Sequence, residues 1–284
     1  MEILCVKQLN LTIDGDLKVK DGSFTIHPGD VALLTGPNGC GKSTFVKLLL
    51  GATFEYKDLN IENTTILYKE THDILNSETD NEAFRRKVCY VSQEDEFETE
   101  SVLDCFINSI DYAVKDNKAR FVFDFIKQFS IQECFGISPE NTKLDRRGRR
   151  ILRLLGLPKR ELTNTDIKAI KLLAMNTKRM SGGQRKLANI FSNLIRYAFC
   201  DLIILDEPLN NLDYNNVRAF SNVLTKIYHT KPELAIILVT HCRSIPIVNR
   251  VITFDPLRKE LREDESYVCS SCFGSVDKDS LYQA

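Results

Sequence analysis

The 284-residue sequence has no hydrophobic run long enough to cross a lipid bilayer. Its longest apolar runs, such as residues 234–239, fall far short of the roughly 20 residues that a transmembrane helix needs. Residues 1–4 do not open a secretory signal peptide. We therefore expect a soluble, cytoplasmic protein that reaches the inner face of a membrane only through a partner.

The sequence also lacks an excess of charge of either sign. Lys and Arg number 38 and Asp and Glu number 39, so the net charge of −1 gives no reason to expect a nucleic-acid or anionic-membrane binder. No internal repeat, low-complexity tract or coiled-coil run is present. Nine cysteines are mostly scattered singly within apolar segments, which is typical of reduced thiols rather than of a disulfide framework.

A glycine-rich loop between a predicted strand (31–35) and a predicted helix is the most informative segment. It fits the pattern G-x-x-x-x-G-K-[ST], and Gly51 is well placed to end the helix. In this context, backbone N–H groups approach phosphate oxygens, Lys42 reaches the β- and γ-phosphates, and the Ser43 hydroxyl binds Mg²⁺. The nucleotide-binding residues expected here are Gly36, Pro37, Asn38, Gly39, Cys40, Gly41, Lys42, Ser43 and Thr44.

The rest of the chain alternates predicted strands and helices. Residues 1–30 alternate apolar and polar positions, which predicts antiparallel strands with tight turns at 14–16 and 21–22. Residues 72–81 are predicted as polar loop, and a helix is predicted over 119–135. Alternating strands and helices favour a mostly parallel sheet with ligands at the carboxyl ends of its strands. Further strands are predicted over 65–68, 88–91, 202–205, 234–239 and 251–254.

Several polar residues follow these strands or open the helices between them. They are Gln93, Ser181 to Gln184, Asp206, Glu207, Asp213 and His241. Together with the phosphate loop, they resemble the ordered motif set of ATP-binding cassette (ABC) ATPases. The Ser-Gly-Gly-Gln signature makes the resemblance specific, because generic phosphate-loop NTPases lack it.

The resemblance covers residues 1–255 and implies an α/β fold of the P-loop NTPase type. The expected architecture is a RecA-like, mostly parallel core sheet with an N-terminal antiparallel β subdomain and an inserted helical subdomain at about 101–180. The interval between Gln93 and Ser181 is longer than is usual in the family, which indicates an insertion at about 106–160. Residues 256–284 are expected to form a separate C-terminal tail.

The family's catalytic roles transfer by position. Glu207 resembles the general base that polarises the attacking water, and His241 resembles the residue that contacts the γ-phosphate. Gln93 resembles the glutamine that touches metal and water. The implied cofactors are ATP and Mg²⁺, and the implied metal ligands are Ser43, Gln93 and Asp206.

The resemblance also implies that two subunits, identical or different, sandwich two ATP molecules head to tail. Ser181, Gly182, Gly183 and Gln184 would act on the ATP held by the opposite subunit, and Asp213 would lie in the loop that couples the two sites. Many family members stack the base on an aromatic residue that residues 13–19 lack, so weaker base stacking is expected.

Two functions remain open. One is the nucleotide-binding subunit of an ABC transporter, with a separate transmembrane partner. The other is a soluble ABC ATPase that switches a ribosome, nuclease or assembly machine. A chromosome-type ATPase is excluded because no long heptad segment separates the two halves of the site.

Two further features allow more than one interpretation. A basic cluster is either a solvated face or a docking surface, for which nucleic acid is one partner. Cys269 and Cys272 form a single C-x-x-C, which is typical of reduced cysteines, half of a zinc site or a redox pair. The basic cluster comprises Arg146, Arg147, Arg149, Arg150 and Arg153.

Overall fold

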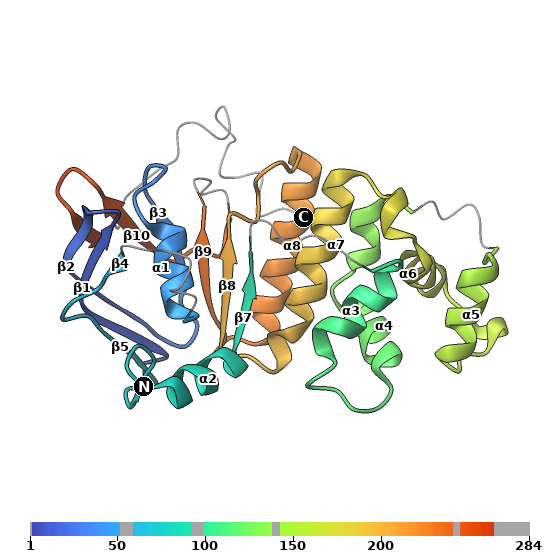
Figure 1. Ribbon diagram of the computed structural model, residues 1–284. Coiled ribbons are helices and arrows are strands. Elements are labelled where there is room, and N and C mark those ends of the chain that lie inside the picture. The colour runs from blue at the N-terminus through green and yellow to red at the C-terminus, as the bar shows by residue number, and fades with distance from the viewer. Residues whose placement is uncertain (1, 52–58, 93–98, 138–142, 241–244, 264–284) are drawn as a thin grey trace. The chain divides into compact units, whose positions relative to one another are not determined.

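A computed structural model describes residues 2–51, 59–92, 99–137, 143–240 and 245–263 (Figure 1). The chain divides into two compact units, one of residues 1–81 with 237–284 and the other of residues 82–236. Within the described ranges, no helix has the length and apolarity needed to span a membrane.

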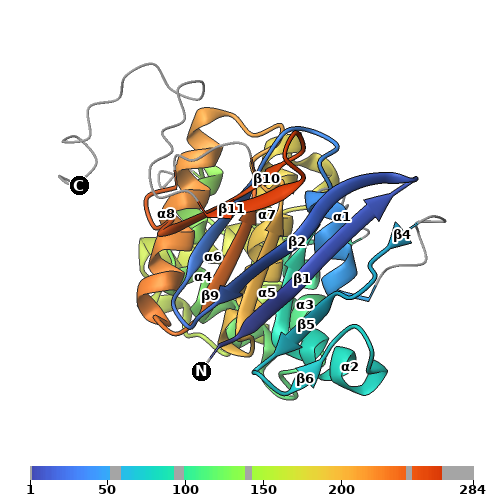
Figure 2. The ribbon, with the colours of Figure 1, turned by 90° about the vertical axis from the view of Figure 1, so that its left-hand side faces the viewer.

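The first unit begins with a long antiparallel hairpin of β1 (Leu4–Ile13) and β2 (Asp16–Ile26) (Figure 2). Asp14 and Gly15 join the strands with positive φ angles of 51° and 76°, as a tight hairpin turn requires. The turn predicted at 14–16 is thus confirmed.

The second predicted turn, at 21–22, is wrong. Strand β2 continues through Asp21 and Gly22, and its register with β1 shifts on either side of the Leu9–Gly22 pair. A Cβ at position 22 would lie 2.8 Å from side-chain atoms of both Leu261 and Val19. Close packing at a β-bulge, rather than a chain reversal, therefore explains this glycine.

Three short strands extend the hairpin. Strand β5 (Thr65–Tyr68) pairs antiparallel with β1 and then with β6 (His72–Asp73), while β4 (Leu59–Asn60) pairs with the end of β1. The sheet order is β2-β1-β5-β6, with β4 beside β1. This confirms the predicted N-terminal antiparallel sheet and the strand predicted at 65–68.

Strand β6 and helix α2 (Glu78–Lys87) both take residues from the segment 72–81 predicted as polar loop. That prediction is therefore wrong at residues 72–73 and beyond residue 77. Ser77 caps the helix, because its hydroxyl accepts a hydrogen bond from the Asp80 N–H over 3.2 Å. Only Asn81 and Phe84 of this helix are buried. Because so few positions face the core, the sequence carries no helical period there.

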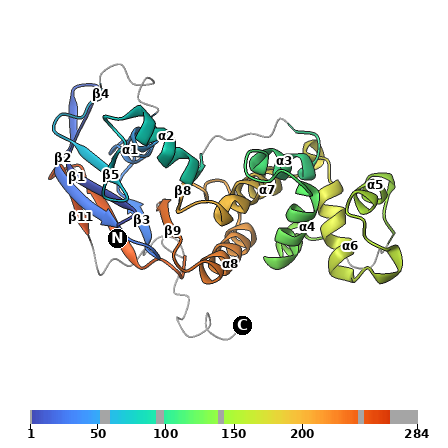
Figure 3. The ribbon, with the colours of Figure 1, turned by 90° about the horizontal axis from the view of Figure 1, so that it is seen from below.

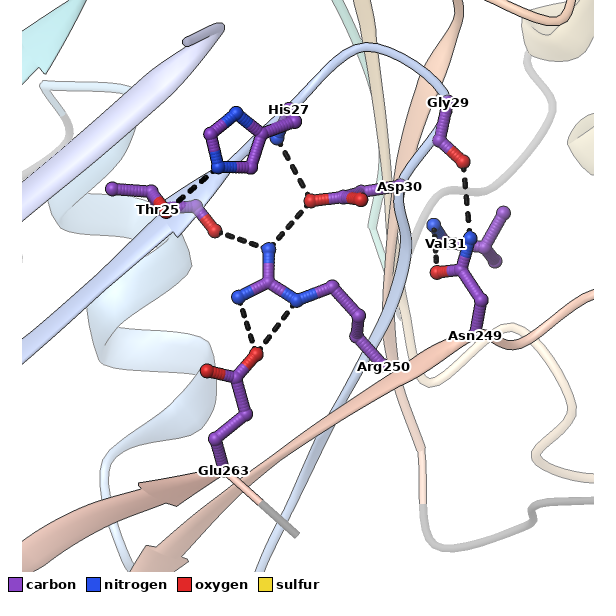
Figure 4. A network of polar contacts seen from close by, with 8 residues as sticks. All are labelled: Thr25, His27, Gly29, Asp30, Val31, Asn249, Arg250 and Glu263. Carbon is purple, nitrogen blue, oxygen red and sulfur yellow. Dashed lines mark hydrogen bonds and ion pairs between the residues drawn. The ribbon is translucent and has the colours of Figure 1, made fainter. Parts of the chain in front are cut away.

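Strand β3 (Val31–Thr35) is buried at every position and pairs in parallel with β10 (Arg250–Asp255), to which β11 (Glu260–Glu263) adds antiparallel. The Arg250 guanidinium donates to the Thr25 carbonyl (2.6 Å), to Asp30 Oδ2 (2.5 Å) and to Glu263 Oε1 (2.6 Å) (Figure 4). This network holds in place the segment that enters β3, the strand that leads into the phosphate loop.

Helix α1 (Lys42–Leu49) follows the phosphate loop, as predicted. Its Phe45 ring packs against Phe24 and Phe254, with ring centroids 5.7 and 6.0 Å away. Gly51 has φ of 73° and donates from its N–H to the Leu48 carbonyl over 3.0 Å. The predicted helix end at this glycine is therefore confirmed.

The second unit contains the parallel pair β7 (Val88–Val91) and β8 (Leu202–Asp206) together with most of the helices. Strand β9 (Ala235–Val239) crosses the division: Ala235 N–H donates to Asp201 O in the second unit, and Thr240 N–H donates to Leu34 O in the first. The fold is thus of the predicted α/β class, with antiparallel and parallel strands and helices.

The helical lobe predicted at about 101–180 lies in the second unit, and most of its described residues are helical. The α-helices are α3 (Val102–Ile110), α4 (Lys118–Gln128), α5 (Arg146–Leu154), α6 (Asn164–Ala174), α7 (Gly182–Leu194) and α8 (Tyr214–Thr230). The 3₁₀ turns are η2 (Ile131–Phe135), η3 (Lys159–Glu161), η4 (Thr177–Arg179) and η5 (Ile195–Ala198).

The single helix predicted over 119–135 is wrong in one respect, because the chain breaks into α4 and η2. Ser130 adopts a left-handed φ of 57°, which no helix interior tolerates. Its hydroxyl accepts a hydrogen bond from Lys226 of α8 over 3.1 Å, and the neighbouring Phe129 ring packs edge-on against Tyr197 at 5.3 Å. Tertiary contacts therefore override the helical pattern.

A buried acid caps α6 in the helical lobe. Thr163 and Asp166 form a capping box, and Lys127 of α4 lies 2.5 Å from Asp166 Oδ1. Burial alone would raise the pKa of Asp166, but its hydrogen bonds from Lys127 and Thr163 outweigh burial and lower the pKa below its ordinary value. The ionised form therefore stabilises the fold.

We expect Asp166→Asn to lower the free energy of unfolding by about 1–2 kcal/mol at neutral pH. The contribution is present above the ordinary carboxyl pKa and is lost as pH falls through the lowered folded-state pKa, so wild type and variant should converge in acid. Chemical denaturation at several pH values measures this. Asp124→Asn, which removes the exposed pair with Arg120, is the control and should cost less than about 0.5 kcal/mol; an equal loss at every pH would refute the linkage.

Candidate functional site

The phosphate loop lies in the first unit and needs glycine for two different reasons. A Cβ at Gly36 would lie 2.7 Å from the Phe254 carbonyl oxygen and 2.9 Å from Cys40 Sγ, so a side chain has no space. Gly39 has open space but a φ of 74°, and Gly41 has a φ of 100° at the start of α1. Residues 37–39 of the loop are exposed, so a ligand can approach their backbone.

The buried Lys42 side chain is held by the carbonyl groups of its own loop. Its Nζ donates to the Gly36 carbonyl over 2.9 Å and to the Pro37 carbonyl over 3.0 Å, and it lies 3.6 Å from Cys40 Sγ. These hydrogen bonds hold the ammonium group at the loop. A positive charge at the N-terminus of α1 suits a phosphate.

Aliphatic side chains of the antiparallel sheet line the loop at Gly41. The atoms nearest a Cβ built there belong to Leu11, Ile13 and Lys18, at 3.0, 3.5 and 3.6 Å. Side chains of this kind can cover a base but cannot stack on it as an aromatic ring does. The weaker base stacking expected from the sequence stays a prediction.

Asp206 and Glu207 lie in the second unit, at the carboxyl end of β8. Asp206 is 3% exposed and Glu207 is 7% exposed. Glu207 adopts a left-handed φ of 47°, an uncommon conformation for glutamate that is typical of residues constrained at functional sites. Both carboxylates are therefore held at the point where the strand turns into a loop.

The predicted metal ligands offer the right chemistry for Mg²⁺. Ser43 supplies a hydroxyl and Asp206 a carboxylate, and Mg²⁺ prefers oxygen ligands of this kind. Across the ranges that the structure describes, no group of three His, Cys, Asp or Glu residues could hold a metal. Mg²⁺ keeps most of its water and binds substrate phosphates, so it needs few protein ligands. The assignment of Ser43, Gln93 and Asp206 as metal ligands stays a prediction.

The signature residues form the N-terminus of α7 in the second unit. Ser181 Oγ accepts from the Gln184 N–H over 3.2 Å, and the Gln184 side chain accepts from the Ser181 N–H over 3.1 Å. This capping box fixes the helix start. Ser181 and Gly182 are exposed, and a Cβ at Gly182 would meet nothing within 4 Å.

A Cβ at Gly183 would lie 2.6 Å from Asn216 Nδ2, so the Asn216 side chain lies directly beside this glycine and would have to shift to admit a larger residue. Asn216 in turn bonds to Asp213, which accepts from the Asn216 N–H (2.8 Å) and from its side-chain amide (3.0 Å). The structure thus brings the signature and Asp213 together through Asn216, a residue that no sequence motif singled out.

Lys186 joins α7 to the segment that follows β8. Its Nζ donates to the Asn210 carbonyl over 2.6 Å and to the Glu207 carbonyl over 3.3 Å. Burial lowers the pKa of Lys186, and the neighbouring Glu207 carboxylate opposes that shift. Sequence reasoning missed this lysine, which lies two residues beyond the signature and carries no motif of its own.

Four residues named from the sequence fall outside the described residues. Gln93, His241, Cys269 and Cys272 are in the ranges 93–98, 241–244 and 264–284. Their roles stay predictions.

Two features define the class of protein. In the first unit, a strand leads into a glycine-rich loop whose carbonyls bind the Lys42 ammonium group, and a helix follows. In the second unit, the signature residues cap the start of α7. This is a phosphate-loop nucleotide-binding protein. A sequence model of the ABC transporter family matches residues 19–210, so the chain belongs to that family. Members of this ATPase family generally bind and hydrolyse ATP.

Named relatives agree with that assignment. The "Probable iron export ATP-binding protein FetA" of Escherichia coli is 23% identical over 251 residues, covering 88% of this chain and 90% of its own length. The phosphate import ATP-binding protein PstB of Rubrobacter xylanophilus is 27% identical over 240 residues, covering 84% and 71%. The structure of CbiO1 from Clostridium perfringens shares the fold, with a TM-score of 0.65, 21% identity and coverage of 93% and 88%.

We expect Lys186→Met to lower kcat for ATP hydrolysis by about 10- to 100-fold while changing the KM for ATP less than about threefold. The variant loses both hydrogen bonds to the segment from Glu207 to Asn210, and small displacements of a catalytic group cost rate rather than binding. Steady-state ATPase assays measure both constants. Lys178→Met, which alters an exposed lysine just before the signature, is the control and should leave them unchanged. A large rise in KM with normal kcat would contradict a positioning role for Lys186.

Proposed function

We propose that this chain is the nucleotide-binding subunit of an ABC transporter and that it works by ATP-driven pairing with a second subunit. The observation that carries the proposal is the open start of α7. Ser181 and Gly182 are exposed there, and a Cβ at Gly182 would meet no atom within 4 Å. A helix N-terminus with free approach suits a phosphate that arrives on another molecule.

ATP binding rests on the phosphate loop. The exposed backbone of residues 37–39 and the N-terminus of α1 surround the β- and γ-phosphates, and Lys42 exchanges its two loop carbonyls for phosphate oxygens. By resemblance to the family, Ser43 and Asp206 would hold Mg²⁺, which would neutralise charge on the β- and γ-phosphates. Thr44 and the remaining loop residues complete the cradle.

Hydrolysis rests on Glu207. Its backbone is held by Lys186, and its carboxylate accepts a proton from the water that attacks the γ-phosphate. By resemblance to the family, Gln93 positions that water and touches the metal, while His241 contacts the γ-phosphate. These two roles rest on the sequence alone.

Pairing rests on the signature. Ser181, Gly182, Gly183 and Gln184 contact the γ-phosphate of ATP held by Lys42 of the other subunit, so two subunits close head to tail around two ATP molecules. Asp213 accepts hydrogen bonds from Asn216, and the Asn216 side chain lies beside Gly183 of the signature. A rearrangement at one site can thereby reach the coupling loop.

The partner is a transmembrane protein that brings this chain to the inner face of a membrane. Relatives are named for iron export and for phosphate import, and CbiO1 is described as part of a transporter complex. Those cargoes belong to those proteins. The names support a transporter role here. The ATPase domain proposed for residues 1–255 also takes in β11 (Glu260–Glu263), which pairs with β10, so the proposed tail at 256–284 is shortened to the residues after this strand.

We expect Glu207→Gln to bind ATP normally and to hydrolyse it about 10² to 10⁴ times more slowly, because the general base is lost. The bound ATP should then hold the variant as a dimer, detected by light scattering with ATP and Mg²⁺. Glu233→Gln, at an exposed site, is the matched control and should turn over normally. Adding Lys42→Ala should abolish nucleotide binding, whereas adding Ser181→Arg should abolish only the dimer. Normal turnover by Glu207→Gln would remove Glu207 as the base.

We further expect tagged Glu207→Gln protein, purified with ATP from its native cells, to retain a protein with several membrane spans. The closed dimer should release its partner slowly, and the double variant with Lys42→Ala should not retain it. Mass spectrometry of detergent extracts identifies what is bound. Retention of ribosomes or a soluble enzyme instead would contradict the transporter role and support the soluble switch ATPase.

A further inference from the structure

Helix α5 presents two opposite faces. Arg146, Arg149, Arg150 and Arg153 fall within about 100° of the helix circumference, because residues follow one another at 3.6 per turn. The opposite side carries the buried residues Gly148, Ile151, Leu152 and Leu155. All five arginines of the helix, Arg147 included, are exposed. Figure 3 shows α5 beyond α6, at the outer end of the helical lobe of the second unit.

These arginines have no partner within the part of the chain that the structure describes. The ion pairs among the described residues of the surrounding lobe join Lys118 to Asp111, Arg120 to Asp124, Lys127 to Asp166 and Lys168 to Glu133, and none includes an arginine of α5. The adjacent acid, Asp145, is engaged as the helix cap, where it accepts the Gly148 N–H over 2.7 Å. Five cationic side chains therefore share one short helix without compensation.

This arrangement opposes the stability of the helix. Three of the arginines lie in the first turn, where the helix dipole disfavours positive charge and where no acidic residue is present. Arginines at spacings of three and four also repel one another. Residues 143–160 carry eight Lys and Arg against one Asp, in a chain whose net charge is only −1. A bound polyanion would reverse both penalties.

We propose that the exposed arginine face of α5 binds the phosphate backbone of a nucleic acid without reading its sequence. Every cation of the helix is arginine, whose planar fork pairs with phosphate oxygens in two parallel hydrogen bonds. The face extends about 10 Å along the helix axis at 1.5 Å per residue, which spans several phosphates of a duplex. This surface is separate from the residues proposed to bind ATP.

The composition of the face favours phosphate over the alternatives. Residues 143–160 contain no aromatic residue, so the segment lacks the rings on which single-stranded nucleic acids stack and the Trp and Tyr that accompany Arg at the centres of protein interfaces. Leu154 is the exposed apolar residue of the helix, at 62%. A helix that lies on a membrane turns its apolar face outward, whereas Ile151, Leu152 and Leu155 are turned into the lobe.

The test uses the full-length protein and a fluorescent 30-base-pair duplex of mixed sequence, prepared as RNA and as DNA. One variant carries Arg146→Gln, Arg149→Gln, Arg150→Gln and Arg153→Gln. A control variant removes the same charge from exposed sites elsewhere: Lys20→Gln, Arg85→Gln, Arg86→Gln and Lys87→Gln. Binding is measured by anisotropy at 50 and 200 mM salt. Thermal unfolding verifies that both variants fold, and the α5 variant should be no less stable because repulsion is removed.

The wild-type protein and the control should bind either duplex, with affinity falling roughly 100-fold between the two salt concentrations if four phosphates are contacted. The α5 variant should lose that binding and keep its ATPase activity. Equal binding by the two variants would overturn the proposal, as would failure of the wild type to bind. Binding only to phosphatidylserine vesicles, or only to polyglutamate, would overturn it in favour of a membrane or an acidic protein. All these readouts are independent of whether the transporter role is correct.

Discussion

The absence of a side chain at Gly36 lets β10 lie directly against the start of the phosphate loop. The Phe254 carbonyl oxygen lies where a Cβ would have to fit, and the Phe254 ring also packs on Phe45 of the helix after the loop. One residue of β10 thereby supports the loop from both ends. Because Arg250 anchors the same strand to the segment that enters β3, the geometry of the loop depends on a strand more than 200 residues away in the sequence.

The second unit supports its functional residues in a similar way. Lys186 holds the segment after β8 by two backbone carbonyls, and Asn216 fills the space beside Gly183 while bonding to Asp213. Neither residue belongs to a motif. Both act on backbone position, which is what a general base and a helix N-terminus need, since their reactivity depends on where they point. The motif residues are therefore only part of the site.

The helical lobe combines stabilising and destabilising electrostatics within a short stretch. Asp166 completes a capping box and pairs with Lys127, so its charge supports the start of α6. Helix α5 does the opposite, with arginines in its first turn and no acid among them. It stays folded because Ile151 and Leu152 are buried against the lobe. Burial on one face thus permits a charge pattern on the other that the helix alone would not favour.

The residues alone were enough to predict the strands at 31–35, 65–68 and 88–91 and the start of a helix at the signature. Short buried strands appear in a sequence as apolar runs between turn residues. The folded structure was needed to show the break at Ser130, the polar helix α2 and the hydrogen bonds of Lys186. Two of these depend on groups far apart in the chain: Lys226 bonds to Ser130 across 96 residues, and Lys186 bonds to Asn210 across 24. Local periodicity carries no information about such contacts, because they exist only once separate elements have packed together.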